Sequence, residues 1–215
     1  MLLSLMGGGA LPAGELARIA NITPQTASGH LARLVSGRLL SVERQGRHRY
    51  YRLAGAPVAD ALEALLALTH RSITHPSISR NGNAPRVTVG TLGYARTCYA
   101  HLAGWLGVQI AESLQSQSLL RPLDAKTYKV TLAGQRWFEA LGIHLPSTSA
   151  SRKNSARRCL DWTERKHHLA GTLGCTLYRR LHELKWLAPV RDTRAVRVTL
   201  RGKKELWDLL RIPVE

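Results

Sequence analysis

Acidic side chains are scarce in this sequence of 215 residues. Fourteen Asp and Glu stand against 31 Lys and Arg, which gives a formal net charge of +17. So one-sided a charge predicts a polyanionic partner, and nucleic acid is the first candidate. An anionic membrane surface is the alternative, but we find no long basic amphipathic helix of the kind that binds one.

Long apolar runs and paired cysteines are missing too. No run of about 18 apolar residues occurs, so no segment is expected to span a bilayer. The apolar start, Met1–Met6, lacks the basic leader of a signal peptide. Three cysteines, an odd number in a chain of this size, indicate reduced thiols rather than a disulfide framework. We therefore expect a soluble cytoplasmic protein without a membrane partner.

Signatures of catalysis are also absent. The sequence has no Gly-rich phosphate loop, no nucleophile elbow and no paired-carboxylate pattern. A thiol- or metal-dependent enzyme that uses Cys159 with His168 is the alternative in this class. We expect a protein that is not an enzyme.

The first 70 residues have the clearest pattern. Thr23 and Pro24 supply an N-cap hydroxyl and a proline at the first helical position, which together predict the start of a helix. A basic segment at 45–48 separates two short strands and predicts a hairpin. The expected elements are helices at 12–20, 25–36 and 57–70 and strands at 39–44 and 49–53. Their order is that of a winged helix-turn-helix.

One face of the helix that follows Thr23 carries small and polar side chains, as a helix in the DNA major groove requires. Its N-terminal amides can approach a phosphate, and the basic hairpin tip suits a minor-groove or phosphate contact. The simpler interpretation of each side chain is a solvated surface. The predicted DNA contacts are Thr23, Gln25, Thr26, Ser28, His30 and Arg33 on the helix, with Arg44, Arg47, His48 and Arg49 on the hairpin.

The second part of the chain contains an internal repeat. His101–Gly107 recurs as His168–Gly174, and Lys129–Gly134 recurs as Arg197–Gly202, at a nearly constant offset. Each copy predicts a long helix, a two-strand wing and a short helix. We expect two similar halves, at about 94–145 and 160–212, packed about a local pseudo-twofold axis.

These patterns predict a fold that is mainly α with small β-hairpin wings (α+β), in which a winged helix-turn-helix precedes a duplicated helix–hairpin–helix domain. A segment rich in Ser, Asn, Pro and Gly predicts a linker between the two parts. The expected domains are the winged helix-turn-helix at 1–70, the linker at 71–86, and an effector and dimerisation domain at 87–215.

Part of the DNA-reading region resembles a known family. Ser28–Leu31 with Leu34, followed by Leu39–Leu40 and by Gly46–Arg47 with Tyr50–Tyr51, is similar to the ArsR/SmtB family of bacterial regulators. The resemblance covers residues 1–70. It implies a homodimeric repressor that an effector, often a metal ion, releases from operator DNA.

The metal ligands usual in that family are not reproduced. Its thiol pair would fall on Ala17 and Ile19, and the acidic and imidazole side chains of the last helix have the wrong spacing. An effector is therefore expected to bind elsewhere in the chain.

Cysteine and histidine gather in the second part. Cys98 and His101 stand three apart on an expected helix, which would put both on one face. Cys159 precedes His168, the counterpart of His101 in the repeat. Thiolate with imidazole is a preferred ligand set for zinc and its softer relatives. One hypothesis is a site of Cys98, His101, Cys159 and His168 for zinc, cadmium or lead, and the simpler one is that these residues only pack.

Two other kinds of effector stay open. An organic ligand would need a pocket, for which the aromatic candidates are Tyr99, Trp105, Trp137, Trp162 and Trp186. Thiol oxidation would act on Cys98 or Cys159. The expected function is a sequence-specific DNA-binding transcriptional regulator that an effector releases, and the alternative is an architectural DNA-binding protein with no effector.

Overall fold

The computed structural model describes residues 1–46, 48–69, 91–145, 156–191 and 193–214. Its packing divides the chain into two units, Met1–Glu63 and Ala64–Glu215. The linker expected at 71–86 lies outside the described residues, so the expected domain boundaries stay a prediction. Among the described helices, none is long and apolar enough to cross a membrane.

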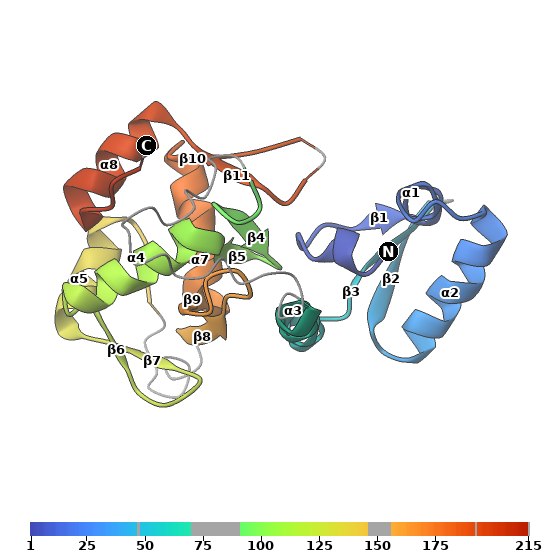
Figure 1. Cartoon of the computed structure of the whole chain (residues 1–215), viewed down its shortest axis with the longest axis horizontal. Coiled ribbons are helices and arrows are strands. Elements are labelled where there is room, and N and C mark those ends of the chain that lie inside the picture. Colours follow the sequence, from blue (N-terminus) through green and yellow to red (C-terminus); the bar gives the residue numbers. More distant parts are fainter. Residues whose placement is uncertain (47, 70–90, 146–155, 192, 215) are drawn as a thin grey trace, which may run out of the picture. The chain divides into compact units, whose positions relative to one another are not determined.

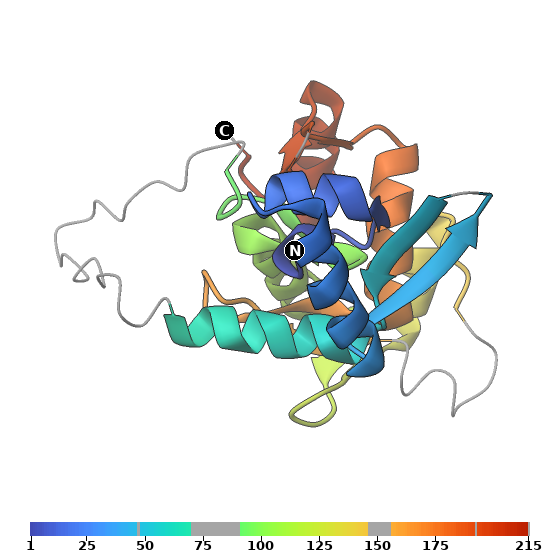
Figure 2. The same ribbon diagram turned by 90° about the vertical axis from the view of Figure 1, so that its right-hand side faces the viewer.

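The helices α1, α2 and α3 and the two strands of the wing follow in the order expected from the sequence, whereas the short strand β1 was not expected (Figure 1). The three strands form one antiparallel sheet in the order β1-β3-β2, and β2 and β3 make a long ribbon (Figure 2). The elements are η1 (Leu3–Leu5), β1 (Leu11–Pro12), α1 (Ala13–Ile19), α2 (Pro24–Ser36), β2 (Leu40–Gln45), β3 (His48–Leu53) and the first part of α3 (Ala56–Thr69), a helix that continues past the boundary at Glu63.

The start of α2 follows from local chemistry. Thr23 has an extended backbone and its hydroxyl accepts the Thr26 N–H, while Pro24 occupies the first turn. Ala27 and Leu31, one turn apart, are fully buried. The helix ends at Ser36, with Gly37 as its C-cap. Burial of one stripe leaves the opposite face of α2 free for a partner.

The C-terminal unit contains the same order of elements twice: hairpin, long helix, hairpin, short helix (Figure 1). The first set is β4 (Arg96–Cys98), β5 (His101–Ala103), α4 (Gly104–Ser116), β6 (Leu120–Pro122), β7 (Tyr128–Val130) and α5 (Leu132–Ala140). The second set is β8 (Arg157–Leu160), β9 (His167–Ala170), α7 (Gly171–Glu183), β10 (Leu187–Pro189), β11 (Val196–Val198) and α8 (Leu200–Leu210). The leading hairpin of each set was not expected from the sequence.

Each set packs its long helix against the leading hairpin of the other set. Helix α4 packs on β9, and α7 packs on β5. Backbone bridges Arg96–Ala195 and Thr127–Arg157 likewise join a strand of one set to the other set. Leucines of both long helices lie in one core with residues of both short helices. Neither set therefore encloses a core of its own.

Two glycines permit this close packing. A methyl group added at Gly107 would lie 2.7 Å from the Leu102 carbonyl oxygen, and one at Gly174 would lie 2.4 Å from that of Leu169. The same added groups would meet the Cβ atoms of His168 and His101, at 3.6 and 3.4 Å. The second glycine of each repeated His-Leu-Ala-Gly-x-Leu-Gly segment thus lets a long helix approach the histidine of the other set.

Candidate DNA-binding surface and buried Cys/His cluster

The outer face of α2 presents all its predicted DNA contacts to solvent. Thr23, Gln25, Thr26, Ser28, His30 and Arg33 are exposed. Two of the hydroxyl groups also bond within the helix: Thr23 accepts from the Thr26 N–H at 3.2 Å, and Ser28 donates to the Pro24 carbonyl at 2.9 Å. The Thr23 and Thr26 hydroxyl oxygens also lie 2.9 Å apart, and the Ser28 oxygen keeps its lone pairs for another donor. This face has the small, polar character that a major-groove helix needs.

The β2–β3 hairpin carries the basic part of the surface. Arg44 and Arg49 are directly opposed cross-strand partners, as are Gln45 and His48, and all four are exposed. Like charges placed directly opposite one another destabilise a hairpin. A phosphate beside Arg44 and Arg49 would relieve that repulsion. Arg47 lies outside the described residues.

Sequence reasoning missed one ion pair on this hairpin. Arg52 of β3 binds Glu43 of β2, and both side chains are well exposed. Glu43 directly precedes Arg44, which the sequence had marked as a DNA contact. In the hairpin register Arg52 is opposite Ser41 and Glu43 is opposite Tyr50, so the pair is diagonal and depends on a register that the sequence pattern does not specify.

The second candidate site is a buried cluster of four side chains from two hairpins. Cys98 and His101 are directly paired across β4 and β5, and Cys159 and His168 are directly paired across β8 and β9. One potential ligand atom from each residue lies within 4.8 Å of the others. All four residues are at most 8% exposed. We call them the Cys/His cluster.

The helix expected to carry Cys98 and His101 is wrong. Only Tyr99 and Ala100 separate β4 from β5, and Tyr99 has the positive φ of 58° that a two-residue hairpin turn calls for. In the second hairpin a longer loop over 161–166 separates the strands. The two Cys–His pairs are therefore alike in structure although their sequence spacings differ.

The two imidazoles of the cluster face each other. His101 Nε2 lies 3.0 Å from His168 Nε2, and the ring centroids are 5.0 Å apart. The other nitrogen of His168, Nδ1, lies 3.3 Å from Asp161 Oδ2. The Asp161 carboxylate therefore lies on the Nδ1 side of the His168 ring, and Nε2 is turned toward His101.

Asp161 is the anchor of the second hairpin. Its Oδ2 accepts from Arg96 Nη2 at 3.0 Å and from the Gly104 N–H at 2.7 Å. Its Oδ1 accepts from the backbone and hydroxyl of Thr163 and from the Glu164 N–H. Both Asp161 and Arg96 are fully buried. Apart from the position of Asp161 two residues after Cys159, no sequence pattern indicated this role.

Charges in this region influence each other strongly. Burial raises the pKa of Asp161, but His168 and Arg96 outweigh it and hold that pKa well below the usual range. Burial lowers the pKa of His168, yet the contacts with Asp161 and Cys159 raise it to about 9. The hydrogen bond with Cys98 is the main influence that lowers the pKa of the Cys159 thiol. The arrangement favours a thiolate at Cys159.

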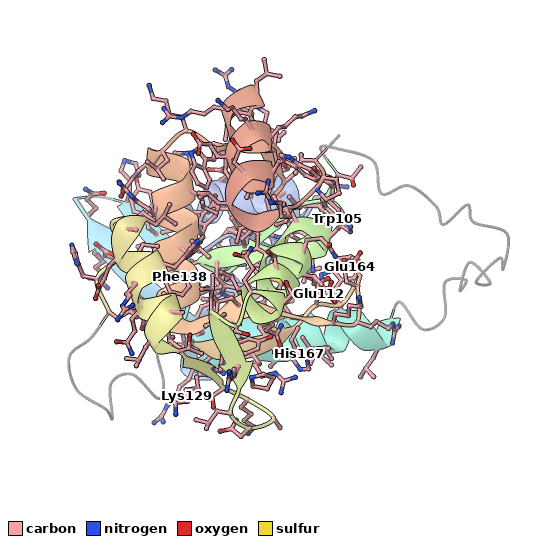
Figure 3. The ribbon with its side chains drawn as sticks, turned by 90° about the vertical axis from the view of Figure 1, so that its left-hand side faces the viewer. Trp105, Glu112, Lys129, Phe138, Glu164 and His167 are labelled. Atoms are coloured by element: carbon pink, nitrogen blue, oxygen red, sulfur yellow. The ribbon has the colours of Figure 1, made fainter. Side chains whose placement is uncertain are left out.

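An exposed contact ties the loop over 161–166 to α4. Lys166 Nζ donates to Glu112 Oε1 at 2.7 Å. Figure 3 shows Glu112 and Glu164 on the same side of the C-terminal unit, and the two carboxylates are close enough to repel. The loop that holds Asp161 is thus fastened at its surface as well as in the core.

Three of the five aromatic residues considered for an organic ligand take part in separate contacts. Trp105 stacks on Tyr94, Trp162 lies 4.7 Å from the Arg96 guanidinium, and Trp137 packs edge-on against Phe138. A small pocket between the two sets is lined by Leu102, Gly107, Ile110, Leu169, Gly174, Leu177, Tyr178 and Leu181. None of the five candidates lines this pocket.

A helix with an exposed polar face, followed by a basic hairpin, makes the N-terminal unit a winged helix-turn-helix, the fold of a class of DNA-binding proteins. No protein-family model matches the chain. Over 203 residues the chain is 46% identical to the uncharacterized HTH-type transcriptional regulator YdfF of Bacillus subtilis (strain 168), a match that covers 94% of this chain and 87% of YdfF. The chain belongs to this family of HTH-type transcriptional regulators.

A solved structure also matches the N-terminal part. It is the homodimeric winged helix-turn-helix DNA-binding domain of Mb0332 from Mycobacterium bovis, described as a possible ArsR-family regulator. The identity is 29%, the match covers 34% of this chain and 70% of that chain, and the TM-score is 0.32. The match to YdfF confirms the prediction of a transcriptional regulator with a helix-turn-helix DNA-binding domain.

Proposed function

We propose that the chain is a repressor that binds operator DNA as a homodimer and leaves it when an effector binds the C-terminal unit. The observation that carries the proposal is the exposed polar face of α2 next to a hairpin with opposed arginines. Helix-turn-helix proteins commonly bind as dimers, because a two-fold protein matches a palindromic site. The sequence resemblance to the ArsR/SmtB family supports both the dimer and the repressor role. We propose no enzymatic activity.

The DNA contacts divide by role. Gln25, Thr26, Ser28 and His30 face base edges or phosphates in the major groove, with Thr23 and the helix N-terminus near a phosphate. Arg33 reaches the backbone beside the groove. Arg44, Arg47, His48 and Arg49 form the second contact through the hairpin.

Selected binding sites from a random DNA pool test the proposal directly. A repressor should bind its selected site roughly a thousandfold or more tightly than random DNA at one fixed salt concentration. Equal affinity for both would instead identify an architectural DNA-binding protein. Sedimentation of the complex with a palindromic site should give two chains per duplex.

Replacing Arg44 by alanine should weaken binding to selected and random DNA alike. Loss of one phosphate contact should lower the slope of log K against log salt by about one unit. Titrations of labelled duplex at several salt concentrations measure this slope. Arg136→Ala, an exposed arginine on α5, is the matched control and should change nothing. An unchanged slope for Arg44→Ala would remove this arginine from the contact set.

Replacing Gln25 by alanine should act on sequence preference instead. A lost bidentate contact to a base lowers discrimination at that base pair by about 1–3 kcal/mol, with little change in the salt slope. Binding to a panel of operators with single base-pair changes measures the effect. If the preference profile of the variant matches that of the wild type, Gln25 does not read a base.

A further inference from the structure

We propose that the Cys/His cluster is a binding site for one thiophilic divalent metal ion, with Zn²⁺ as the first candidate. Cys98, His101, Cys159 and His168 would supply all four ligands. Binding of the ion does not depend on the function proposed above. Its role as the effector that releases DNA does rest on that function.

The spacing of the ligand atoms suits a tetrahedral ion. Zinc bonds of about 2.0–2.1 Å to nitrogen and 2.3 Å to sulfur place neighbouring ligand atoms about 3.3–3.8 Å apart. The cluster's ligand atoms lie within 4.8 Å of one another, and its two Nε2 atoms are 3.0 Å apart. An ion at the centre therefore requires only small side-chain rotations.

The two leading hairpins contribute equally to the proposed site. Each of two short hairpins contributes one thiol and one imidazole as directly opposed cross-strand partners. Each histidine also lies against the close-packed glycine of the other set, Gly107 or Gly174. The ion would join the two sets, and all four positions around it would come from the protein.

Asp161 orients one ligand from behind. A metal-bound histidine usually donates its second ring N–H to a carboxylate, which fixes the ring and strengthens the ligand. Asp161 Oδ2 lies 3.3 Å from His168 Nδ1, which places a carboxylate on that side of the ring and leaves Nε2 for the ion. Arg96 and the Gly104 N–H in turn hold Asp161 in place. Asp161 is thus a positioning residue rather than a ligand.

The chemistry of the donors limits the ion. Calcium and magnesium prefer oxygen ligands, whereas thiolate and imidazole suit zinc and softer ions such as cadmium. Two thiolates neutralise a divalent charge, so loading the site places no net charge in the core. Since no coordination position is left for water, the ion would have a structural or regulatory role rather than a catalytic one.

The decisive experiment titrates Co²⁺ into the reduced full-length protein and follows its absorption spectrum. We expect one equivalent to give the intense ligand-field bands of a four-coordinate ion and thiolate charge-transfer bands, and one equivalent of Zn²⁺ to remove them. Cys98→Ser or Cys159→Ser alone should weaken the thiolate bands, and the double variant should abolish them. Cys175→Ser should keep them, because this third cysteine is outside the cluster. A six-coordinate spectrum, or no stoichiometric binding, would overturn the proposal.

A second measurement uses only the wild-type protein, in case the serine variants fail to fold. Zn²⁺ should protect Cys98 and Cys159 from alkylation at a urea concentration that leaves the apo thiols reactive, while Cys175 reacts at an unchanged rate. Mass spectrometry of the peptides identifies each site. Equal rates for all three cysteines with and without Zn²⁺ would contradict the assignment.

The regulatory role is tested separately with operator DNA. Zn²⁺ should lower the operator affinity of the wild type by at least tenfold and leave the affinity of Cys98→Ser unchanged. Metal binding without any change in DNA affinity would refute the effector role and leave the assignment of the metal site unaffected. Failure to prefer any DNA sequence would refute the proposed function but not the metal site.

Discussion

Replacing Asp161 by alanine is expected to destabilise the C-terminal unit by about 3–5 kcal/mol, the usual cost of removing one partner of a buried ion pair. The Arg96 guanidinium would lose its carboxylate, and both groups are fully buried. The Gly104 N–H at the start of α4 would also lose its acceptor, Asp161 Oδ2. Urea unfolding followed by tryptophan fluorescence measures the effect. All five tryptophans lie in the C-terminal unit, so the signal follows that unit alone.

Asp208→Ala is the matched control, because Asp208 is an exposed carboxylate on α8. It should change the free energy of unfolding by less than about 0.5 kcal/mol. If Asp161→Ala lowers the free energy of unfolding by less than about 1 kcal/mol, the prediction is wrong, because a buried charge that has lost its partner should cost more. In that case the Leu92 carbonyl and the Thr163 hydroxyl, which also accept hydrogen bonds from Arg96, would be enough to stabilise the buried guanidinium.

Replacing Gly202 by alanine should be similarly severe. The added methyl group would lie 2.1 Å from the Trp186 carbonyl oxygen and 2.8 Å from its carbon. That carbonyl already accepts the Thr199 N–H at 2.9 Å, so the backbone cannot move aside without breaking the cap of α8. Overpacking usually costs about 1–3 kcal/mol, and a clash with fixed backbone belongs at or above the upper end of that range.

Lys204→Ala on the same helix supplies the comparison, because Lys204 is exposed. The same fluorescence measurement should give a change within about 0.5 kcal/mol of zero. Gly134→Ala should behave like Gly202→Ala, since its methyl group would lie 2.1 Å from the Leu119 carbonyl oxygen. A mild effect at both glycines would show that α5 and α8 can move away from their hairpins.

The N-terminal unit could be predicted from sequence because its signals are local. Thr23 and Pro24 mark the start of α2 through their own backbone and hydroxyl chemistry, and the structure places the helix at Pro24–Ser36. The two strands of the wing and the helix after them lie within a residue or so of their expected bounds. Which base each side chain reads depends on the DNA, so those contacts stay predictions.

The Cys/His cluster could be predicted in composition but not in geometry. A separation of three residues puts two side chains on one face of a helix, and it also places them opposite each other across a two-residue hairpin. Cys98 and His101 follow the second rule. The same spacing therefore fits a helix and a hairpin. What distinguishes the hairpin is the positive φ of Tyr99, and sequence does not indicate it because tyrosine rarely adopts that conformation.

Asp161 and Arg96 were out of reach for a different reason. They are 65 residues apart in sequence, and their pairing depends on how one hairpin packs near the other. Charged residues are rarely fully buried, so a surface position was the default for both. Long-range packing of this kind has no signature in a local pattern.

The exchange of contacts between the two sets also governs when the protein can fold during synthesis. Ser113 of α4 donates to the Leu210 carbonyl at 2.6 Å, and Leu206, Leu210 and Ile212 belong to the same core as the leucines of α4. Contacts so distant in sequence form late, whereas a domain completed early can fold as the chain emerges from the ribosome. Until Ile212 has emerged from the ribosome, we therefore expect a nascent chain to have a folded winged helix and an incompletely folded C-terminal unit.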